Sequence, residues 1–195
     1  MSTTQPIKDR NELELLKGYY RDVCPNPRNY ALISTGINTA LRISDILSLR
    51  WRDVCELPFR SFRRHISIIE RKTKKTACVA INRSLSQALS LYLDTLPAPC
   101  PEDYIFHKTS PETPDVPLSR SQAFRIIKRA CSRLELPEHI SCHSLRKTFG
   151  YHAWAAGANP TVLMVIYNHS SFSVTKRYLG IEQEDKDNIF LNLNL

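Results

Sequence analysis

The chain has 195 residues, which is enough for one domain whose hydrophobic core needs neither disulfides nor a structural metal. Hydrophobic residues make up 42% and charged residues 24%, close to globular averages, so a disordered or fibrous chain is excluded. Lysine and arginine exceed aspartate and glutamate by 27 − 19 = 8, and this net charge of +8 favours a polyanion such as nucleic acid as the partner.

Several other protein classes are not supported by the sequence. No apolar stretch approaches the roughly 20 residues of a membrane span, and residues 1–6 lack the apolar segment of a secretory signal. We therefore expect no membrane partner and a cytoplasmic location. The six cysteines include no Cys-x-x-Cys pair, and no His-Glu-x-x-His motif is present, so we expect free thiols and no metal site.

The first part of the chain predicts helices separated by a proline-rich break. Asp9 is a predicted N-cap for a helix that runs to about Asp22. Residues 24–27 contain two prolines and end this helix, and Pro27 suits the first position of the next one. A third helix is expected to begin near Ser44.

The hydrophobic period then changes from helical to strand-like. Alternating apolar residues at 66–69 and 77–81 predict two antiparallel strands joined by a turn at 72–75. A helix is expected at 84–96. Residues 104–106, Tyr-Ile-Phe, could add a short strand.

The second half of the chain is predicted to be helical. Ser119 is a predicted cap of one helix, and further helices are expected after His143, Pro160 and Ser171. No linker is long enough to divide two domains. The predicted fold class is therefore α+β, mostly α-helical with a small antiparallel β-sheet, in a single domain over residues 1–195.

Basic residues are concentrated around the predicted hairpin. Seven lysines and arginines lie in residues 60–75, opposed only by Glu70. On a hairpin they would form a cationic ridge suited to a phosphate backbone, and we expect Arg71, Lys74 and Lys75 to contact such a backbone. The alternative is that these charges keep the hairpin edge from pairing with other strands.

Three other segments place polar residues where packing alone would not require them. Arg42 stands at the start of a predicted apolar helix, where its charge is suited to an anion. His143 and Arg146 are three residues apart, so a helix would put both side chains on one face. An Asn-His-Ser-Ser segment at 168–171 precedes Tyr178 by a predicted turn and helix.

Taken in order, these residues resemble the tyrosine recombinase or phage integrase family, whose pattern is arginine, lysine, His-x-x-Arg, histidine and tyrosine. The resemblance covers nearly the whole chain, from about Ile7 to Leu195. It implies the catalytic-domain fold of that family and site-specific recombination of double-stranded DNA, with no cofactor and no metal. The residues that it assigns to catalysis are Arg42, Lys72, His143, Arg146, His169 and Tyr178.

The chemistry of strand cleavage explains these residue types. Phosphoryl transfer concentrates negative charge on the nonbridging phosphate oxygens, which the fixed cations Arg42 and Arg146 could stabilise. The resemblance implies that Tyr178 attacks phosphorus, forms a 3′-phosphotyrosine and releases a 5′-hydroxyl. Since a free tyrosine has a pKa near ~10, it needs a proton acceptor at neutral pH, and His143 is the expected one.

The other roles also follow from the resemblance. Lys72, on the hairpin turn, would give a proton to the leaving 5′-oxygen. Lys74 is an alternative, because a shift of two residues keeps the same side of a strand. His169 would bind the phosphate, Asp45 would hold catalytic side chains as an acceptor, and Lys147 would add a phosphate contact.

The sequence departs from the family pattern in two respects. Asn168 stands where many members have glycine, and asparagine also tolerates a left-handed backbone. Members usually carry an N-terminal core-binding domain that clamps DNA, but Arg42 comes too early for one, so we expect the catalytic domain only. The resemblance further implies a dimer to tetramer on DNA, an apolar tail at 183–195 exchanged between subunits, and a bacterial or phage-encoded protein associated with the nucleoid.

Three alternatives remain at this stage. Residues 159–179 could be a helix-turn-helix that reads DNA, although this leaves Arg42, His143 and Arg146 without a shared purpose. The chain could be a DNA-binding regulator that keeps the fold without cleavage. A type IB topoisomerase would use the same chemistry on one duplex.

Overall fold

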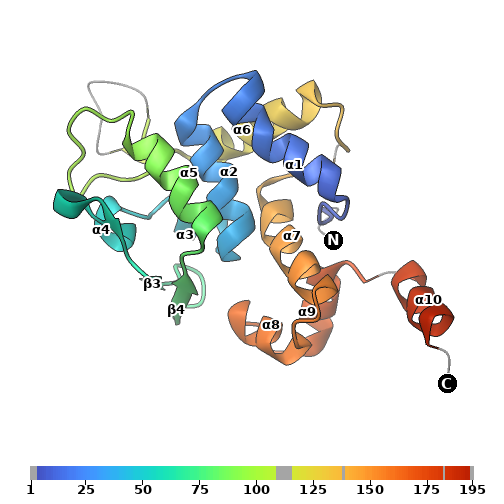
Figure 1. The fold of residues 1–195 in the computed structure, drawn as a ribbon. Helices are drawn as coiled ribbons and strands as arrows, with labels where there is room; N and C mark the ends of the chain where they lie inside the picture. The colour runs from blue at the N-terminus through green and yellow to red at the C-terminus, as the bar shows by residue number, and fades with distance from the viewer. Residues whose placement is uncertain (1–3, 109–115, 138, 182, 194–195) are drawn as a thin grey trace.

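The computed structural model describes residues 4–108, 116–137, 139–181 and 183–193. Helices dominate this part of the chain (Figure 1). In chain order they are α1 (Arg10–Gly18), the π-helix η1 (Tyr19–Val23), α2 (Pro27–Thr39), α3 (Ile43–Ile46), α4 (Trp51–Val54), the 3-10 helix η2 (Leu57–Phe59), α5 (Arg83–Leu93), α6 (Arg120–Arg133), α7 (Cys142–Ala155), α8 (Pro160–Ile166), α9 (Phe172–Leu179) and α10 (Gln183–Asn192).

The predicted helix starts are confirmed, because local capping chemistry sets them. The Asp9 carboxylate accepts hydrogen bonds from the first backbone amides of α1, and Asn26 caps α2 with Pro27 as the first helical residue. Ser119 and Gln122 form a reciprocal capping box at the start of α6. The third predicted helix exists, but α3 has only one turn.

Helix α2 lies at the centre of the molecule and packs against both α5 and α7 (Figure 1). One cluster of buried side chains, which includes Trp51 and Phe106, lies around α4 and α5. A second cluster, which includes Tyr20 and Ile33, joins α1, α2 and α6. Leu145 of α7 belongs to this second cluster, so α7 turns its apolar side to the core and leaves its polar side for the site.

The predicted hairpin is present. Strands β3 (His65–Ile69) and β4 (Thr76–Ala80) pair antiparallel, with His65 opposite Ala80 and Ile69 opposite Thr76. A second small pair, β1 (Cys55–Glu56) with β2 (Ser61–Phe62), was not predicted.

The strand expected at residues 104–106 does not form. Tyr104 makes one isolated bridge to Arg50, and the amide of Ile105 donates to the carbonyl of Leu49. Pairing goes no further because the chain enters α4 at Trp51. The apolar residues that suggested a strand, Ile105 and Phe106, are instead buried in the core.

The C-terminal helices surround the end of α7. Helices α7, α8 and α9 pack together on the lower side of the molecule in Figure 1, and α10 lies apart from them. The α10 helix contacts the N-terminal segment through an ion pair between Lys8 and Asp185, with 3.4 Å between Nζ and Oδ2. No helix in the described ranges is both long enough and apolar enough to cross a membrane.

Candidate active site

A cavity of about 840 Å³ lies between the start of α3, the turn of the β3–β4 hairpin, the first turns of α6 and α7, and α9. These elements come from distant parts of the sequence. The residues that line the cavity include five of the six expected catalytic residues and one expected DNA contact: Arg42, Lys72, His143, Arg146, Tyr178 and Arg71.

Arg42 is presented to this cavity by the break between α2 and α3. Helix α2 ends at Ala40 in a left-handed conformation, and Arg42 occupies the extended N-cap position of α3. Its Nη1 donates to Oε1 of Glu70 at 2.6 Å, and 17% of the Arg42 side chain is exposed. The guanidinium is therefore held on one side and accessible on another.

Arg146 is buried, and its guanidinium is fixed by backbone carbonyls. Nη1 donates to the carbonyl of Ala40, and Nη2 donates to that of Tyr167 at 3.0 Å. The same Nη1 lies 3.9 Å from the Glu70 carboxylate. Burial and then the charge of Arg42 lower the pKa of Arg146, but a guanidinium keeps its charge in proteins. A fixed cation thus stands at the base of the cavity.

The ring of Tyr178 packs against both candidate histidines. The ring centroids lie 4.9 Å from His143 and 4.5 Å from His169, each in an edge-on arrangement. The Arg146 guanidinium carbon is 5.9 Å from the Tyr178 ring centroid, and Lys147 Nζ is 5.8 Å from it. This one chain therefore brings the predicted nucleophile to the predicted base and cation.

Both histidines are neutral near pH 7. Burial, followed by the positive charges of Lys147 and Arg146, lowers the pKa of His143 to about 4. Burial, followed by Arg146 and Arg42, lowers the pKa of His169 to about 4 as well. A neutral imidazole has a free lone pair, so either ring can accept a proton.

The turn before His169 follows the expected asparagine geometry. Asn168 has φ of 54°, in the left-handed region, as the sequence predicts for the residue that replaces glycine. Nδ1 of His169 lies 3.0 Å from the Thr175 hydroxyl, which holds the orientation of the ring. His169 does not line the cavity itself but lies behind the Tyr178 ring.

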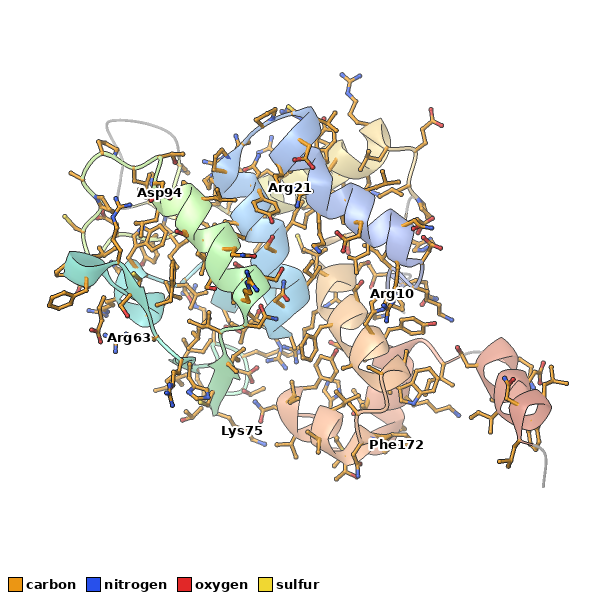
Figure 2. The ribbon with its side chains drawn as sticks, in the orientation of Figure 1. Arg10, Arg21, Arg63, Lys75, Asp94 and Phe172 are labelled. Atoms are coloured by element: carbon orange, nitrogen blue, oxygen red, sulfur yellow. The ribbon has the colours of Figure 1, made fainter. Side chains whose placement is uncertain are left out.

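The hairpin residues divide into two groups. Arg71 and Lys72 line the cavity, whereas Lys74 does not. Both lysines lie outside the strands, in the connection between β3 and β4, and Lys74 has φ of 59°. The argument that Lys72 and Lys74 share one side of a strand therefore does not apply. Lys75 is exposed at the lower end of the hairpin (Figure 2).

Two residues with predicted supporting roles are buried. Asp45 is buried, and its Oδ1 accepts from the backbone amide of Arg71 at 3.0 Å, so it acts on the hairpin backbone next to Lys72. Lys147 is only 7% exposed, and its ammonium donates to the Thr4 carbonyl. Its ammonium lies 5.8 Å from the centroid of the Tyr178 ring, so the predicted phosphate contact would be made beside the nucleophile.

Two residues of this region were missed by the sequence analysis. Glu70, noted only as the single acid among basic residues, is buried and paired with Arg42. Tyr167 had no assigned role, yet it is fully buried, donates from its hydroxyl to the Arg146 carbonyl at 2.7 Å, and stacks on His169. The only signal in the sequence was the isolated acidic residue in a basic run.

The cysteine, histidine and acidic side chains are the possible disulfide partners and metal ligands of this chain. All six cysteines are free thiols. Within the described ranges, no group of three or more His, Cys, Asp or Glu side chains is arranged to hold a metal ion.

Comparison with known proteins identifies the family. The model of the phage integrase family matches residues 9–184. The chain belongs to this family. It is 38% identical over 184 residues to the probable integrase/recombinase YoeC of Bacillus subtilis (strain 168), covering 94% of this chain and 93% of that protein.

Solved structures show the same fold. The crystal structure of XerA recombinase matches with a TM-score of 0.78 at 20% identity, over 100% of this chain and 66% of that one. A lambda integrase dimer bound to a COC′ core site matches with a TM-score of 0.68 at 14% identity, over 92% of this chain and 60% of that one.

These similarities confirm the expected family, the expected fold class, and the enzyme class of a tyrosine-type site-specific DNA recombinase. Beyond YoeC, this chain spans about half the length of other curated relatives, 52% of one tyrosine recombinase and 48% of another.

Proposed function

We propose that this chain cleaves and rejoins double-stranded DNA through a 3′-phosphotyrosyl link at Tyr178. The observation that carries the proposal is the contact of the Tyr178 ring with two neutral histidines beside the buried guanidinium of Arg146. The proximity of these groups supports a shared role at one phosphodiester.

The two arginines would bind the nonbridging oxygens of the scissile phosphate. Arg146 is held by two carbonyls and Arg42 by Glu70, so both are oriented before the substrate arrives. Donors that are oriented in advance stabilise developing charge without reorganising during the reaction. A planar guanidinium can also meet two oxygens at once.

The two histidines would have different roles, one at the Tyr178 hydroxyl and one at the phosphate. His143 would accept the phenolic proton of Tyr178, since its lowered pKa keeps the ring neutral. His169 would donate from Nε2 to the phosphate, with Nδ1 accepting from the Thr175 hydroxyl 3.0 Å away.

Lys72 would protonate the leaving 5′-oxygen from the hairpin turn. The phosphotyrosyl ester conserves the energy of the broken phosphodiester bond. A 5′-hydroxyl from a second strand can then attack the ester, release Tyr178 and reseal the DNA without ATP.

The proposal includes the binding partner and the oligomeric state on DNA. The net charge of +8 and the exposed hairpin cations favour duplex DNA as the partner, with Arg71, Lys74 and Lys75 on the backbone. We propose that residues 1–195 act as one catalytic domain in the cytoplasm and assemble on DNA as a dimer to tetramer. The tail at 183–195 would dock into a neighbouring subunit, since Ile189, Phe190 and Leu191 are exposed on α10.

The test uses nicked duplexes made from the DNA that flanks the encoding gene, incubated with the protein in EDTA. A covalent protein–DNA adduct should form, disappear in Tyr178→Phe and persist in the matched control Tyr104→Phe, which lies at the α4 bridge. An adduct that survives Tyr178→Phe would contradict the nucleophile. Salt-sensitive binding without any adduct would indicate a regulator, and plasmid relaxation by a monomer would indicate a topoisomerase.

A further inference from the structure

Glu70 joins three separate parts of the candidate site through one carboxylate. Oε1 accepts from Nη1 of Arg42 at 2.6 Å and lies 3.9 Å from Nη1 of Arg146. Oε2 accepts from the hydroxyl of Thr73 and from Nδ2 of Asn168, the latter at 3.0 Å. The side chain of Glu70 is 1% exposed.

Each of these partners is next to, or is, a proposed catalytic residue. Arg42 is itself a phosphate ligand in the proposed function. Thr73 follows Lys72 in the hairpin turn, and Asn168 precedes His169 in the turn between α8 and α9. The carboxylate of Glu70 therefore connects the start of α3, the hairpin turn and the α8–α9 turn.

Closing the hairpin does not require this carboxylate. The backbone of Glu70 already closes the turn, because its amide donates to the Lys75 carbonyl and its carbonyl accepts from the Lys74 amide, both at 2.9 Å. A buried carboxylate is unfavourable unless it is paired and hydrogen-bonded. An apolar residue would close the same turn without that penalty, so the charge needs another explanation.

The ionised form of Glu70 is maintained by its partners. Burial by itself would raise the pKa of Glu70, but the hydrogen bonds from Thr73 and Arg42 and the charge of Arg42 outweigh burial, and the pKa lies below its usual value. The carboxylate is thus a permanent acceptor near pH 7.

We propose that Glu70 is a positioning residue for DNA cleavage, which orients Arg42 and the turns that carry Lys72 and His169 before DNA binds. The inference rests on the proposed function. By taking one N–H of Arg42, Glu70 fixes the direction in which the other guanidinium donors face the phosphate. Errors of about 1 Å in such an arrangement lower rates about 100-fold.

The experiment compares wild-type protein with Glu70→Gln, which preserves shape and removes the charge. At saturating DNA, the rate of Tyr178 adduct formation should fall about 10- to 100-fold, the usual effect of losing a residue that orients a ligand. The Kd for DNA should stay the same or decrease, because removing a negative charge near the phosphate cannot weaken attraction to it. A general loss of structure would weaken binding instead. The control is Glu14→Gln, which removes the same charge from an exposed ion pair with Lys17 and should react at the wild-type rate.

Two milder variants keep the inference testable if Glu70→Gln does not fold. Thr73→Val removes one hydrogen bond to the carboxylate, and Asn168→Gly removes another while accepting the left-handed backbone. Each should slow adduct formation without weakening DNA binding.

The outcomes separate this inference from the proposed function. Wild-type rates in the folded variants, or weaker binding with an unchanged rate, would overturn the role of Glu70 and leave the proposed function intact. Absence of any adduct with the wild-type protein would overturn both.

Discussion

The imidazole of His169 meets the ring of Tyr178 edge-on, with centroids 4.5 Å apart and planes at 69°. His169 also stacks on the buried Tyr167 ring, with centroids 5.1 Å apart. The hydroxyl of Tyr167 donates to the Arg146 carbonyl, and the Arg146 guanidinium carbon lies 4.8 Å from the Tyr167 ring centroid. The Tyr167 ring centroid also lies 5.2 Å from that of Tyr178. One buried tyrosine thus contacts three of the proposed catalytic residues, and moving it should disturb all of them.

Gly150→Ala should displace Tyr167. A Cβ at residue 150 would lie 2.1 Å from the Tyr167 hydroxyl oxygen and 2.9 Å from its ring carbons, and the rigid ring has no flexible end to move away. We expect a loss of about 2–3 kcal/mol in the free energy of unfolding, measured by urea titration, from overpacking. Gly18→Ala is the control, because its added Cβ would meet only the flexible ends of the Asp22 and Arg21 side chains. Equal losses in the two variants would contradict the role of Tyr167.

The two buried histidines should make stability depend on pH. Their pKa values of about 4 lie below the value of about 6.5 in an unfolded chain. Between these pH values the unfolded state binds more protons than the folded state. The contribution of the two neutral histidines to the free energy of unfolding is therefore fully present above about pH 6.5 and is lost as the pH falls towards 4. Urea unfolding at several pH values should show that the free energy of unfolding rises with pH over this range. The slope reports the number of protons taken up on unfolding, and His143→Gln or His169→Gln should each lower that number by up to about one. An unchanged slope in both variants would contradict the buried neutral state.

A change of the leaving group can show whether Lys72 or Lys74 is the general acid. Lys72→Ala should slow cleavage about 100-fold or more, the typical contribution of a general acid, whereas Lys74→Ala should affect the rate little. A substrate with sulfur in place of the bridging 5′-oxygen releases a thiolate that needs no proton, so it should restore cleavage by Lys72→Ala. The readout is the rate of adduct formation. Loss and rescue in Lys74→Ala instead would assign the acid to Lys74.

The exposed apolar side chains of α10 should matter only in the assembly. Phe190 is 79% and Leu191 is 75% exposed, so changing both to serine should leave the Tm of the free protein unchanged. Burying two such side chains against a neighbour contributes about 3 kcal/mol, so the DNA-bound oligomer should weaken about 100-fold, as measured by sedimentation. Val23→Ser, at an exposed position of η1, is the control. Normal assembly and recombination after deletion of residues 183–195 would exclude the exchanged tail.

Local chemistry made much of this molecule predictable. Helix starts at Asp9, Pro27 and Ser119 follow from capping side chains and proline geometry, which act within a few residues of the chain. The hairpin follows from alternating apolar residues around a polar turn. The ordered polar motif from Arg42 to Tyr178 identified the family without any knowledge of distances.

Only the tertiary structure decided which of these residues touch. Glu70 and Asn168 are 98 positions apart, and Arg146 and Ala40 are 106 apart, so no periodic pattern could connect them. The same reason applies to Lys147, whose predicted phosphate contact said nothing of its burial beside the Tyr178 ring. A local pattern reports what a side chain can do, but its burial and partners depend on packing between elements that meet only in the folded chain.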